Sequence, residues 1–378
     1  MSKSKTIMMI AGEASGDSHG AEVIKAIHQK SKDIKFVGIG GSAMRKAGME
    51  MLFDAAKIAV VGIVEVLKHY GEIKQAWRLA VDTLKTRKPD LLILIDYPGF
   101  NLRLAKVAHE LGIKILYYVS PQIWAWHKSR IHKIKAYVNH MAVILPFEEK
   151  FYKDAGVPAT YVGCPMVDEV KSVGGKAKAR AKLKLPKDKT IIGLAPGSRH
   201  SELSRLLPVL AIAADRLHAH YPNSEFVIPL ASTITREDIE SYFIHSPIKP
   251  VIIEEHSDTV IEACDVLVCS SGTITLETAI IGTPMVIIYK TAPLTYMIGK
   301  RLVTIDHIGL CNIIAGKRLV AELLQHDLTA DNIVLETQKL LDDNNARETM
   351  LKGYTEIRKK LGHGGAAKNV AKLAFELI

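Results

Sequence analysis

Cysteine is scarce in this 378-residue chain, and motifs that would fix a metal chemistry are missing. The four cysteines are widely spaced and form no C-x-x-C pair. This pattern indicates neither a disulfide framework nor a zinc site, and it favours a reduced, cytoplasmic protein. No D-x-D pair and no His or Cys cluster with metal spacing occurs. The sequence therefore predicts neither a metal nor a cofactor.

Long apolar runs are also absent. A helix that spans a bilayer needs about 20 consecutive apolar residues, and no run reaches that length. Residues Met1–Thr6 lead into an apolar run that is only as long as a strand, so we predict no signal peptide. We expect a protein that is soluble or lies on a membrane surface.

The formal net charge is +10, from 50 Lys and Arg against 40 Asp and Glu. Such an excess favours an acidic partner, which would be a nucleic acid, an anionic membrane surface or a phosphorylated substrate. The basic runs, such as Lys176–Lys184, are short and more typical of a solvated helix or linker. We therefore expect no nucleic-acid partner.

Strand-length apolar runs alternate with helical patterns, which is typical of a parallel α/β fold. A segment poor in large apolar residues, Val173–Lys189, separates two sets of runs. The first set is Ile7–Ala11, Phe36–Ile39, Leu91–Ile95, Ile113–Val119, Met141–Leu145 and Thr160–Val162, and the second is Ile191–Leu194, Glu225–Pro229, Val251–Ile253, Val266–Cys269 and Met285–Tyr289.

We predict two doubly wound parallel-sheet domains, residues 1–165 and 166–362. We expect residues 363–378 to form a terminal helix that packs back on the first domain or on a partner chain. A homodimer is therefore one of the two alternatives. Two such domains facing each other would form an interdomain cleft. Ligands of these sheets bind beyond the carboxyl ends of the strands.

The most informative stretch is Ser270–Glu277, between two predicted buried strands. Ser271, Gly272 and Thr273 fall where a strand stops and a helix starts, so free backbone N–H groups can face a phosphate. Glu277, one turn later, suits the hydroxyls of a ribose. The alternative is an ordinary Ser or Thr cap on a crossover helix.

A second loop of this kind, Ala195–Arg199, follows the strand Ile191–Leu194. Arg199 can bind a phosphate through two parallel hydrogen bonds, and the loop at Ser198 offers backbone donors. Two anion loops in one domain predict a site for a diphosphate whose transfer needs no metal.

In the first domain, a glycine-containing loop follows the first strand and opens a helix beginning near Ser18. Its glycines, including Gly16, permit close approach of the backbone, and Ser15 or Asp17 can cap the helix. Glu13 and Asp17 would repel a pyrophosphate. The loop therefore suits sugar hydroxyls or an amide, unless it is a plain turn.

Asp96 directly follows five apolar strand residues, Leu91–Ile95. Partial desolvation raises the pKa of such an acid and makes it a usable general base. The alternative is an Asp that caps the next turn.

Two further segments are rich in apolar and aromatic residues. Ser120–Trp126 holds two of the three Trp residues, which could line a sugar or acyl group or could serve in packing between domains. Ile58–Leu67 is apolar and precedes basic and aromatic residues. It suits either an anionic membrane interface or a core element.

In order and spacing, these motifs resemble those of the lipid A disaccharide synthase family, over essentially the whole chain. They are Ala11–Gly20, Asp96–Asn101, Ser120–Trp126, Pro146–Glu148, Ala195–Arg199, Ser270–Glu277 and Leu310–Asn312. The resemblance implies an inverting glycosyltransferase of GT-B architecture that needs no metal. Its donor would be UDP-2,3-diacylglucosamine and its acceptor lipid X, which is 2,3-diacylglucosamine 1-phosphate. The products would be UDP and the β-1,6-linked disaccharide 1-phosphate, made at the cytoplasmic face of the inner membrane, where the protein would be peripheral.

By the same resemblance, Asp96 matches the family's probable base on the acceptor 6-hydroxyl. The residues that match its substrate and nucleotide loops are Glu13, Ser15, Gly16, Ser198, Arg199, Ser271, Gly272, Thr273, Glu277 and Asn312. The chain departs from the family pattern at His19, Gly99, Cys311 and Ala321. Gly99 stands where the family usually has a second acid, which leaves Asp96 as the principal base.

Two other functions compete with this interpretation. A related GT-B enzyme, such as a UDP-GlcNAc 2-epimerase or a lipid-linked transferase, would act on non-acylated UDP-GlcNAc. A non-catalytic nucleotide-sugar binding protein would bind UDP without turnover and would be indifferent to the loss of Asp96.

Overall fold

The structure is a computed structural model that describes residues 5–57, 70–126, 129–254, 256–292, 296–297 and 305–378. The chain divides into two compact units, Met1–Asp168 with His363–Ile378, and Glu169–Gly362. The apolar segment Ile58–Leu67 lies outside the described residues. No helix in the described parts of the chain has the length and apolar character that crossing a bilayer requires.

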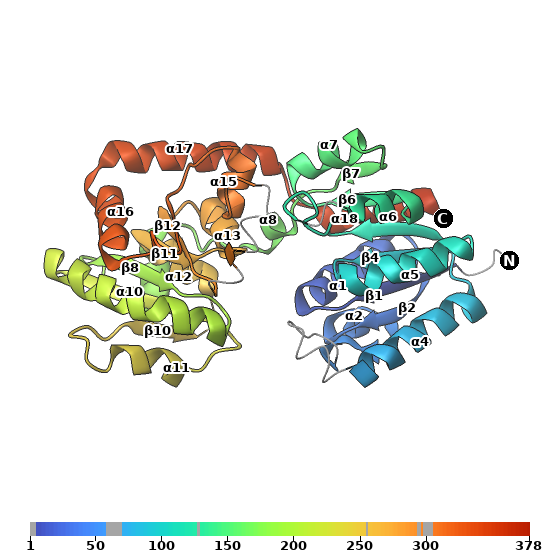
Figure 1. Ribbon diagram of the computed structural model, residues 1–378, viewed down its shortest axis with the longest axis horizontal. Coiled ribbons are helices and arrows are strands. Elements are labelled where there is room, and N and C mark those ends of the chain that lie inside the picture. Colours follow the sequence, from blue (N-terminus) through green and yellow to red (C-terminus); the bar gives the residue numbers. More distant parts are fainter. Residues whose placement is uncertain (1–4, 58–69, 127–128, 255, 293–295, 298–304) are drawn as a thin grey trace. The chain divides into compact units, whose positions relative to one another are not determined.

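The first unit contains a seven-stranded sheet in which all neighbouring strands are parallel (Figure 1). The strand order is β3-β2-β1-β4-β5-β6-β7, so the winding direction reverses between β1 and β4. The strands are β1 Thr6–Ala11, β2 Lys35–Gly40, β3 Met49–Asp54, β4 Leu91–Ile95, β5 Lys114–Tyr118, β6 His140–Val143 and β7 Ala159–Tyr161.

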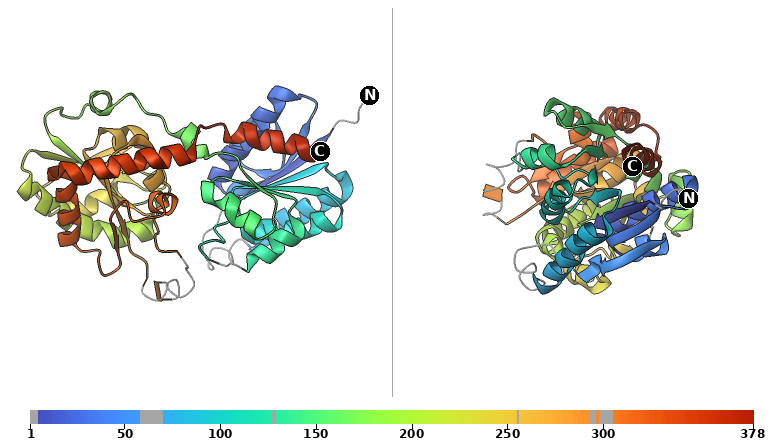
Figure 2. Two further views of the ribbon diagram at one scale, coloured as in Figure 1. Left: turned by 90° about the horizontal axis from the view of Figure 1, so that it is seen from above. Right: turned by 90° about the vertical axis from the view of Figure 1, so that its right-hand side faces the viewer.

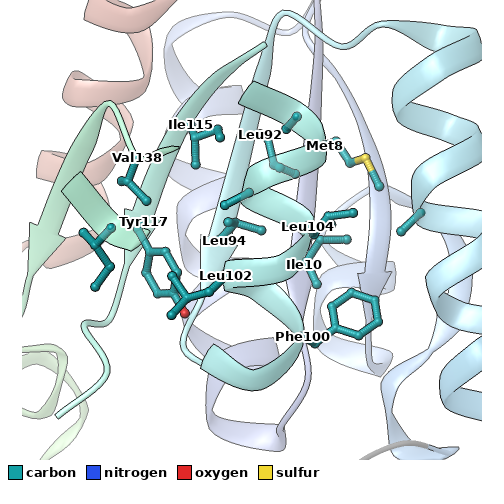
Figure 3. Close-up of a cluster of buried hydrophobic side chains, with 14 of the residues drawn as sticks. Met8, Ile10, Leu92, Leu94, Phe100, Leu102, Leu104, Ile115, Tyr117 and Val138 are labelled. Carbon is teal, nitrogen blue, oxygen red and sulfur yellow. The ribbon is translucent and has the colours of Figure 1, made fainter. Parts of the chain in front are cut away.

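Helices cover both faces of this sheet, because successive strand residues point to opposite faces and are apolar on both. One face packs against α4, α5, α6 and α7, and the other against α1, α2 and α18. Figure 3 shows α5 lying over β1, β4 and β5, with Phe100, Leu102 and Leu104 directed at the sheet. The bounds are α1 Ala14–Lys30, α2 Ser42–Lys46, α4 Tyr70–Arg87, α5 Pro98–Glu110, α6 Arg130–Tyr137, α7 Pro146–Asp154 and α18 Ala366–Leu377, with the short η1 at Ala55–Lys57.

The terminal helix α18 packs on α1 within the first unit (Figure 2, left). Asp168 accepts hydrogen bonds from the Gly365 N–H at 2.9 and 2.7 Å, just before the helix begins. Asn369 donates to the Val162 carbonyl at 2.9 Å. The apolar face of α18 is therefore covered by its own unit, and a partner chain is not needed to bury it.

The second unit contains a six-stranded parallel sheet in the order β10-β9-β8-β11-β12-β13, which reverses between β8 and β11. Its strands are β8 Thr190–Ala195, β9 Ser224–Leu230, β10 Val251–Glu254, β11 Val266–Ser270, β12 Met285–Tyr289 and β13 Glu322–Leu324. Its helices are α9 Lys176–Lys182, α10 His200–His220, α11 Arg236–Glu240, η2 Ser241–Phe243, α12 Ser257–Ala263, α13 Ile274–Ile281, α15 Leu310–Ala315, α16 Ala330–Asp342 and α17 Asn344–Leu361, while α8 Pro165–Glu169 joins the units. The prediction of two doubly wound parallel-sheet domains is confirmed.

An ion pair between the buried Arg180 and the largely buried Asp265 fixes α9 to the amino-terminal ends of β8 and β11. Asp265 accepts from Lys176 at 2.6 Å, from Arg180 at 2.6 Å and from the Ile191 N–H at 2.8 Å. Burial alone would raise the pKa of Asp265, but the hydrogen bonds and positive charges outweigh it and hold that pKa below its usual value. The Arg180 side chain is buried, so removal of Asp265 would leave its positive charge without this carboxylate partner.

Asp265→Ala should lower the free energy of unfolding by about 3–5 kcal/mol, the usual cost of removing one partner from a buried ion pair. The measurement is urea unfolding at pH 7. As a control, Glu225→Ala breaks the more exposed pair with Lys189 and should cost about 1 kcal/mol or less. Equal losses would contradict the anchoring role.

The same pair predicts a pH dependence. The pKa of Asp265 is lower in the folded protein, so its contribution is fully present above the unfolded-state pKa of about 4. It should be lost as the pH falls from there through the folded-state pKa. The difference in unfolding free energy between wild type and Asp265→Asn should shrink below about pH 4.

Candidate functional site

In the first unit, the loops after β1 and β4 lie side by side. The two strands are neighbours and end in register, with Ala11 paired to Ile95. A Cβ atom at Gly12 would overlap the ring of Tyr97, so only glycine permits this contact. Two of the predicted loops therefore meet at the point where the strand order reverses, which is where such sheets bind ligands.

Asp96 occupies a strained turn. Asp96 and Tyr97 both have positive φ angles, 45° and 46°, which non-glycine residues rarely adopt. The Asp96 carbonyl accepts hydrogen bonds from the amide of Asn101 at 2.7 Å and from the hydroxyl of Tyr117 at 2.6 Å. Both donors are fully buried. These two hydrogen bonds hold the Asp96 backbone in place, and the fixed backbone limits the directions that the Asp96 side chain can take.

Burial and, to a lesser extent, the nearby charge of Glu13 together raise the pKa of Asp96 to about 6. The backbone hydrogen bond of Tyr97 and the charge of His19 act in the opposite direction. Glu13 directly precedes α1, and His19 lies in the second turn of that helix. The predicted raised pKa of Asp96 is thus present, with Glu13 adding to its cause.

The glycine loop differs from the prediction in its cap. Helix α1 begins at Ala14 rather than near Ser18, and no side chain caps it. The Asp17 carboxylate instead accepts from the N–H groups of Gly41, Ala43 and Met44, at 2.7, 2.9 and 3.0 Å. Asp17 therefore caps α2, and its hydrogen bonds hold the loop after β2 against the helix that follows β1. Ser15 is exposed in the first turn of α1, whereas Gly16 is buried against the strand ends.

The two Trp residues of Ser120–Trp126 have different surroundings. Trp124 is buried and donates to the Glu148 carboxylate at 3.0 Å. Burial raises the pKa of Glu148 to about 7. Trp126 is 46% exposed, with the Arg130 guanidinium 6.0 Å from its ring. Trp124 is thus a core residue, and sequence reasoning gave no role to its partner Glu148.

In the second unit, the carboxyl ends of β8, β9, β10 and β11 surround a cavity of about 710 Å³. Six predicted residues line it together: Ser198, Arg199, Ser271, Gly272, Thr273 and Glu277. Sequence reasoning missed the lining residues Glu202, Ser232, Glu254, His256 and Ser257. In the sequence only their position, at or after the carboxyl ends of β8, β9 and β10, could have indicated these residues, because they belong to no recognisable motif.

The loop before α13 is held by its own hydroxyl groups. Ser271 donates to the Ile308 carbonyl at 3.0 Å, and Thr275 donates to the Gly272 carbonyl at 2.9 Å. Gly272 has open space at its Cα, so a ligand can approach its backbone. Glu277 lies in the first turn of α13, and burial raises its pKa.

Asn312 does not line the cavity. Its side chain is fully buried. It donates to the Val320 carbonyl and to Glu322 at 2.9 and 2.8 Å, and it accepts from the N–H groups of Leu319 and Val320 at 2.9 Å each. Glu322 in turn accepts from the Gly309 N–H at the start of α15. In this structure Asn312 supports a loop and does not present its amide to a ligand.

Within the described residues, no group of three or more His, Cys, Asp or Glu side chains is arranged to hold a metal ion. The polar groups around Asp96 and around the cavity are backbone N–H groups, hydroxyls, carboxylates, the imidazoles of His19 and His256, and the guanidinium of Arg199. This set suits sugars and phosphates.

Comparison with known proteins gives concordant matches. A family model described as lipid-A-disaccharide synthetase matches residues 7–375. The chain is 45% identical over 375 residues to the lipid-A-disaccharide synthase of Geobacter sulfurreducens, covering 99% of this chain and 98% of that protein. It is 46% identical over 372 residues to that of Nitrosococcus oceani, covering 98% and 96%.

Among solved structures, the UDP-GlcNAc 2-epimerase of Neisseria meningitidis bound to UDP-GlcNAc matches with a TM-score of 0.67 at 12% identity, covering 98% of this chain and 100% of that one. Acinetobacter baumannii MurG matches with a TM-score of 0.58 at 14% identity, covering 98% and 99%. These likenesses show the fold alone, and they agree with the predicted GT-B class.

The family model and the relatives cover nearly the whole chain, including both units and all the loops described above. The resemblance found in the sequence is confirmed, and the chain belongs to the lipid-A-disaccharide synthetase family.

Proposed function

We propose that this protein is an inverting glycosyltransferase that transfers 2,3-diacylglucosamine from UDP-2,3-diacylglucosamine to the 6-hydroxyl of lipid X. The observation that carries the proposal is the cavity of the second unit, where both anion loops predicted from the sequence meet at the reversal between β8 and β11. The names of the relatives support the same reaction. They do not favour the epimerase or the binding protein.

The second unit would hold the donor. The Ser271 N–H donates to the Ile288 carbonyl at 3.2 Å, so Ser271 supports the loop. The Arg199 guanidinium and the backbone N–H groups of Ser198, Gly272 and Thr273 would bind the diphosphate, at the amino-terminal ends of α10 and α13. Glu277 would accept hydrogen bonds from the ribose hydroxyls. These groups neutralise the charge that develops on UDP as it leaves, and they are the donors the reaction needs if no metal takes part.

The first unit would activate the acceptor. Asp96 takes the proton of the acceptor 6-hydroxyl while the oxygen of that hydroxyl forms a bond to the anomeric carbon of the donor. The bond from that carbon to the phosphate oxygen breaks, and its electron pair leaves with UDP. Glu13, Ser15 and Gly16 follow β1, next to the strand end that carries Asp96, and would bind acceptor hydroxyls. Asn312 would act indirectly, by holding the segment after α15 through Leu319 and Val320 and by binding Glu322.

We further propose that the protein is peripheral on the cytoplasmic face of the inner membrane, because both lipid substrates lie there. The net charge of +10 favours an anionic surface. The apolar segment Ile58–Leu67 is the candidate contact by sequence. Val64→Glu should release the protein from vesicles that contain anionic lipid while the unfolding transition is unchanged, and loss of soluble protein would instead favour a core role.

Asp96→Asn should reduce UDP release by at least about 100-fold, the low end for a general base. The assay measures UDP released from UDP-2,3-diacylglucosamine with and without lipid X, in detergent and excess EDTA. Release by the wild type should need the acceptor and resist EDTA, and UDP should bind both proteins equally. No release from the acylated donor would overturn the proposal, and turnover of UDP-GlcNAc would favour the alternative enzyme.

The pH profile should report Asp96. Since its pKa is about 6, kcat/KM should fall as the pH drops through about 6 and the base becomes protonated. Glu13 raises that pKa, so Glu13→Gln should move the acidic limb to lower pH, whatever it does to the maximal rate. An acidic limb that stays in place in Glu13→Gln would show that another group limits the reaction.

A further inference from the structure

The proposed phosphate donors of the Ala195–Arg199 loop already have an anionic partner within the protein. The Ser198 N–H donates to one oxygen of the Glu202 carboxylate at 3.0 Å. The Arg199 guanidinium donates to the other oxygen, also at 3.0 Å. One carboxylate therefore binds the two groups that a phosphate would use.

The position of Glu202 follows from the local backbone. Gly197 has a φ of 116°, and a Cβ there would overlap the Glu202 carboxylate, which lies directly over the turn. Glu202 is in the first turn of the 21-residue helix α10, where a negative charge is stabilised. Its side chain is 16% exposed, whereas that of Arg199 is 62% exposed. The carboxylate is thus the inner member of the pair, and the arginine is free to turn toward a ligand.

We propose that Glu202 is an internal competitor for the diphosphate: its carboxylate must give up the Ser198 N–H before UDP can take it, and it competes with UDP for the charge of the Arg199 guanidinium. The inference rests on the proposed function and concerns the same site. A backbone N–H makes one strong hydrogen bond, so carboxylate and phosphate cannot share it. Two negative groups in contact also repel each other.

Such competition has a use in a transferase. Tight binding of the nucleotide in both substrate and product lowers KM without raising kcat, and it delays release of the product. A carboxylate that returns to the loop would favour departure of UDP. Glu202 would then set how tightly the nucleotide is held, while Arg199 supplies the attraction.

The test is calorimetric titration of the full-length protein with UDP, uridine and inorganic pyrophosphate. Glu202→Gln keeps the size of the side chain and can still accept from Ser198, but it removes the charge. It should bind UDP and pyrophosphate about 10-fold more tightly than the wild type, and uridine equally well. Glu237→Gln is the control for overall charge, because Glu237 is exposed in the same unit and does not line the cavity. It should leave all three affinities unchanged.

A double variant tests whether the tighter binding of UDP and pyrophosphate in Glu202→Gln depends on Arg199. If the charge of Glu202 acts by occupying Arg199, the tightening should disappear when Glu202→Gln is made in an Arg199→Ala background. UDP and pyrophosphate binding that is unchanged or weaker in Glu202→Gln, with a normal unfolding transition, would overturn the competitor role. Weaker uridine binding as well would show that Glu202 only shapes the loop.

The two proposals fail separately. Wild-type protein that binds pyrophosphate but not UDP or uridine would contradict the proposed donor site, and the pyrophosphate comparison would still decide the role of Glu202. Wild-type and variant proteins that bind neither UDP nor pyrophosphate would exclude both proposals.

Discussion

Parallel pairing of β1 with β4 and of β8 with β11 is the constraint on which both candidate sites depend. At each pair the strand order reverses. The loops that follow the two strands therefore turn to opposite faces of the sheet and leave a crevice between them. Glu13 and Asp96 are 83 positions apart in the sequence, yet they influence each other electrostatically because Ala11 and Ile95 end in register. Ser198 and Thr273 meet around one cavity for the same reason.

Carboxylates in the two units serve two different purposes. Asp17, Glu322 and Asp168 accept from backbone N–H groups and hold helix starts or loops in place. Asp96 instead keeps a raised pKa near the surface of the first unit, and its backbone carbonyl, rather than its carboxylate, carries the structural hydrogen bonds. The partners of an acid therefore distinguish a structural carboxylate from a chemical one. A raised pKa alone does not, because that of Glu148 is also raised while its carboxylate binds Trp124 in the core.

The strained turn at Asp96 and Tyr97 is supported by the core, and Asp96 is the residue proposed as the general base. Two consecutive residues with positive φ cost free energy, of the order of 1–3 kcal/mol each. The hydrogen bonds from Asn101 of α5 and from Tyr117 of β5 offset that cost, and Tyr117 belongs to the apolar cluster in Figure 3. A general base must be held in a fixed direction to be effective, and a constrained turn at the end of a rigid sheet provides that fixed direction.

The sequence by itself determined the two parallel α/β domains, the position of Asp96 after a buried strand, and the two loops around Ser198 and Thr273 at the point where a strand gives way to a helix. These follow from local patterns: apolar runs of strand length, and small or charged residues where a strand gives way to a helix. Tertiary structure alone decided that Asp17 caps α2, that Asn312 is enclosed with Glu322, and that Glu202 binds the donors of its own loop. The physical reason is that a polar side chain takes whichever partner the fold brings within about 3 Å. That partner can lie tens of residues away in the sequence, or be a neighbour whose rotamer only packing selects.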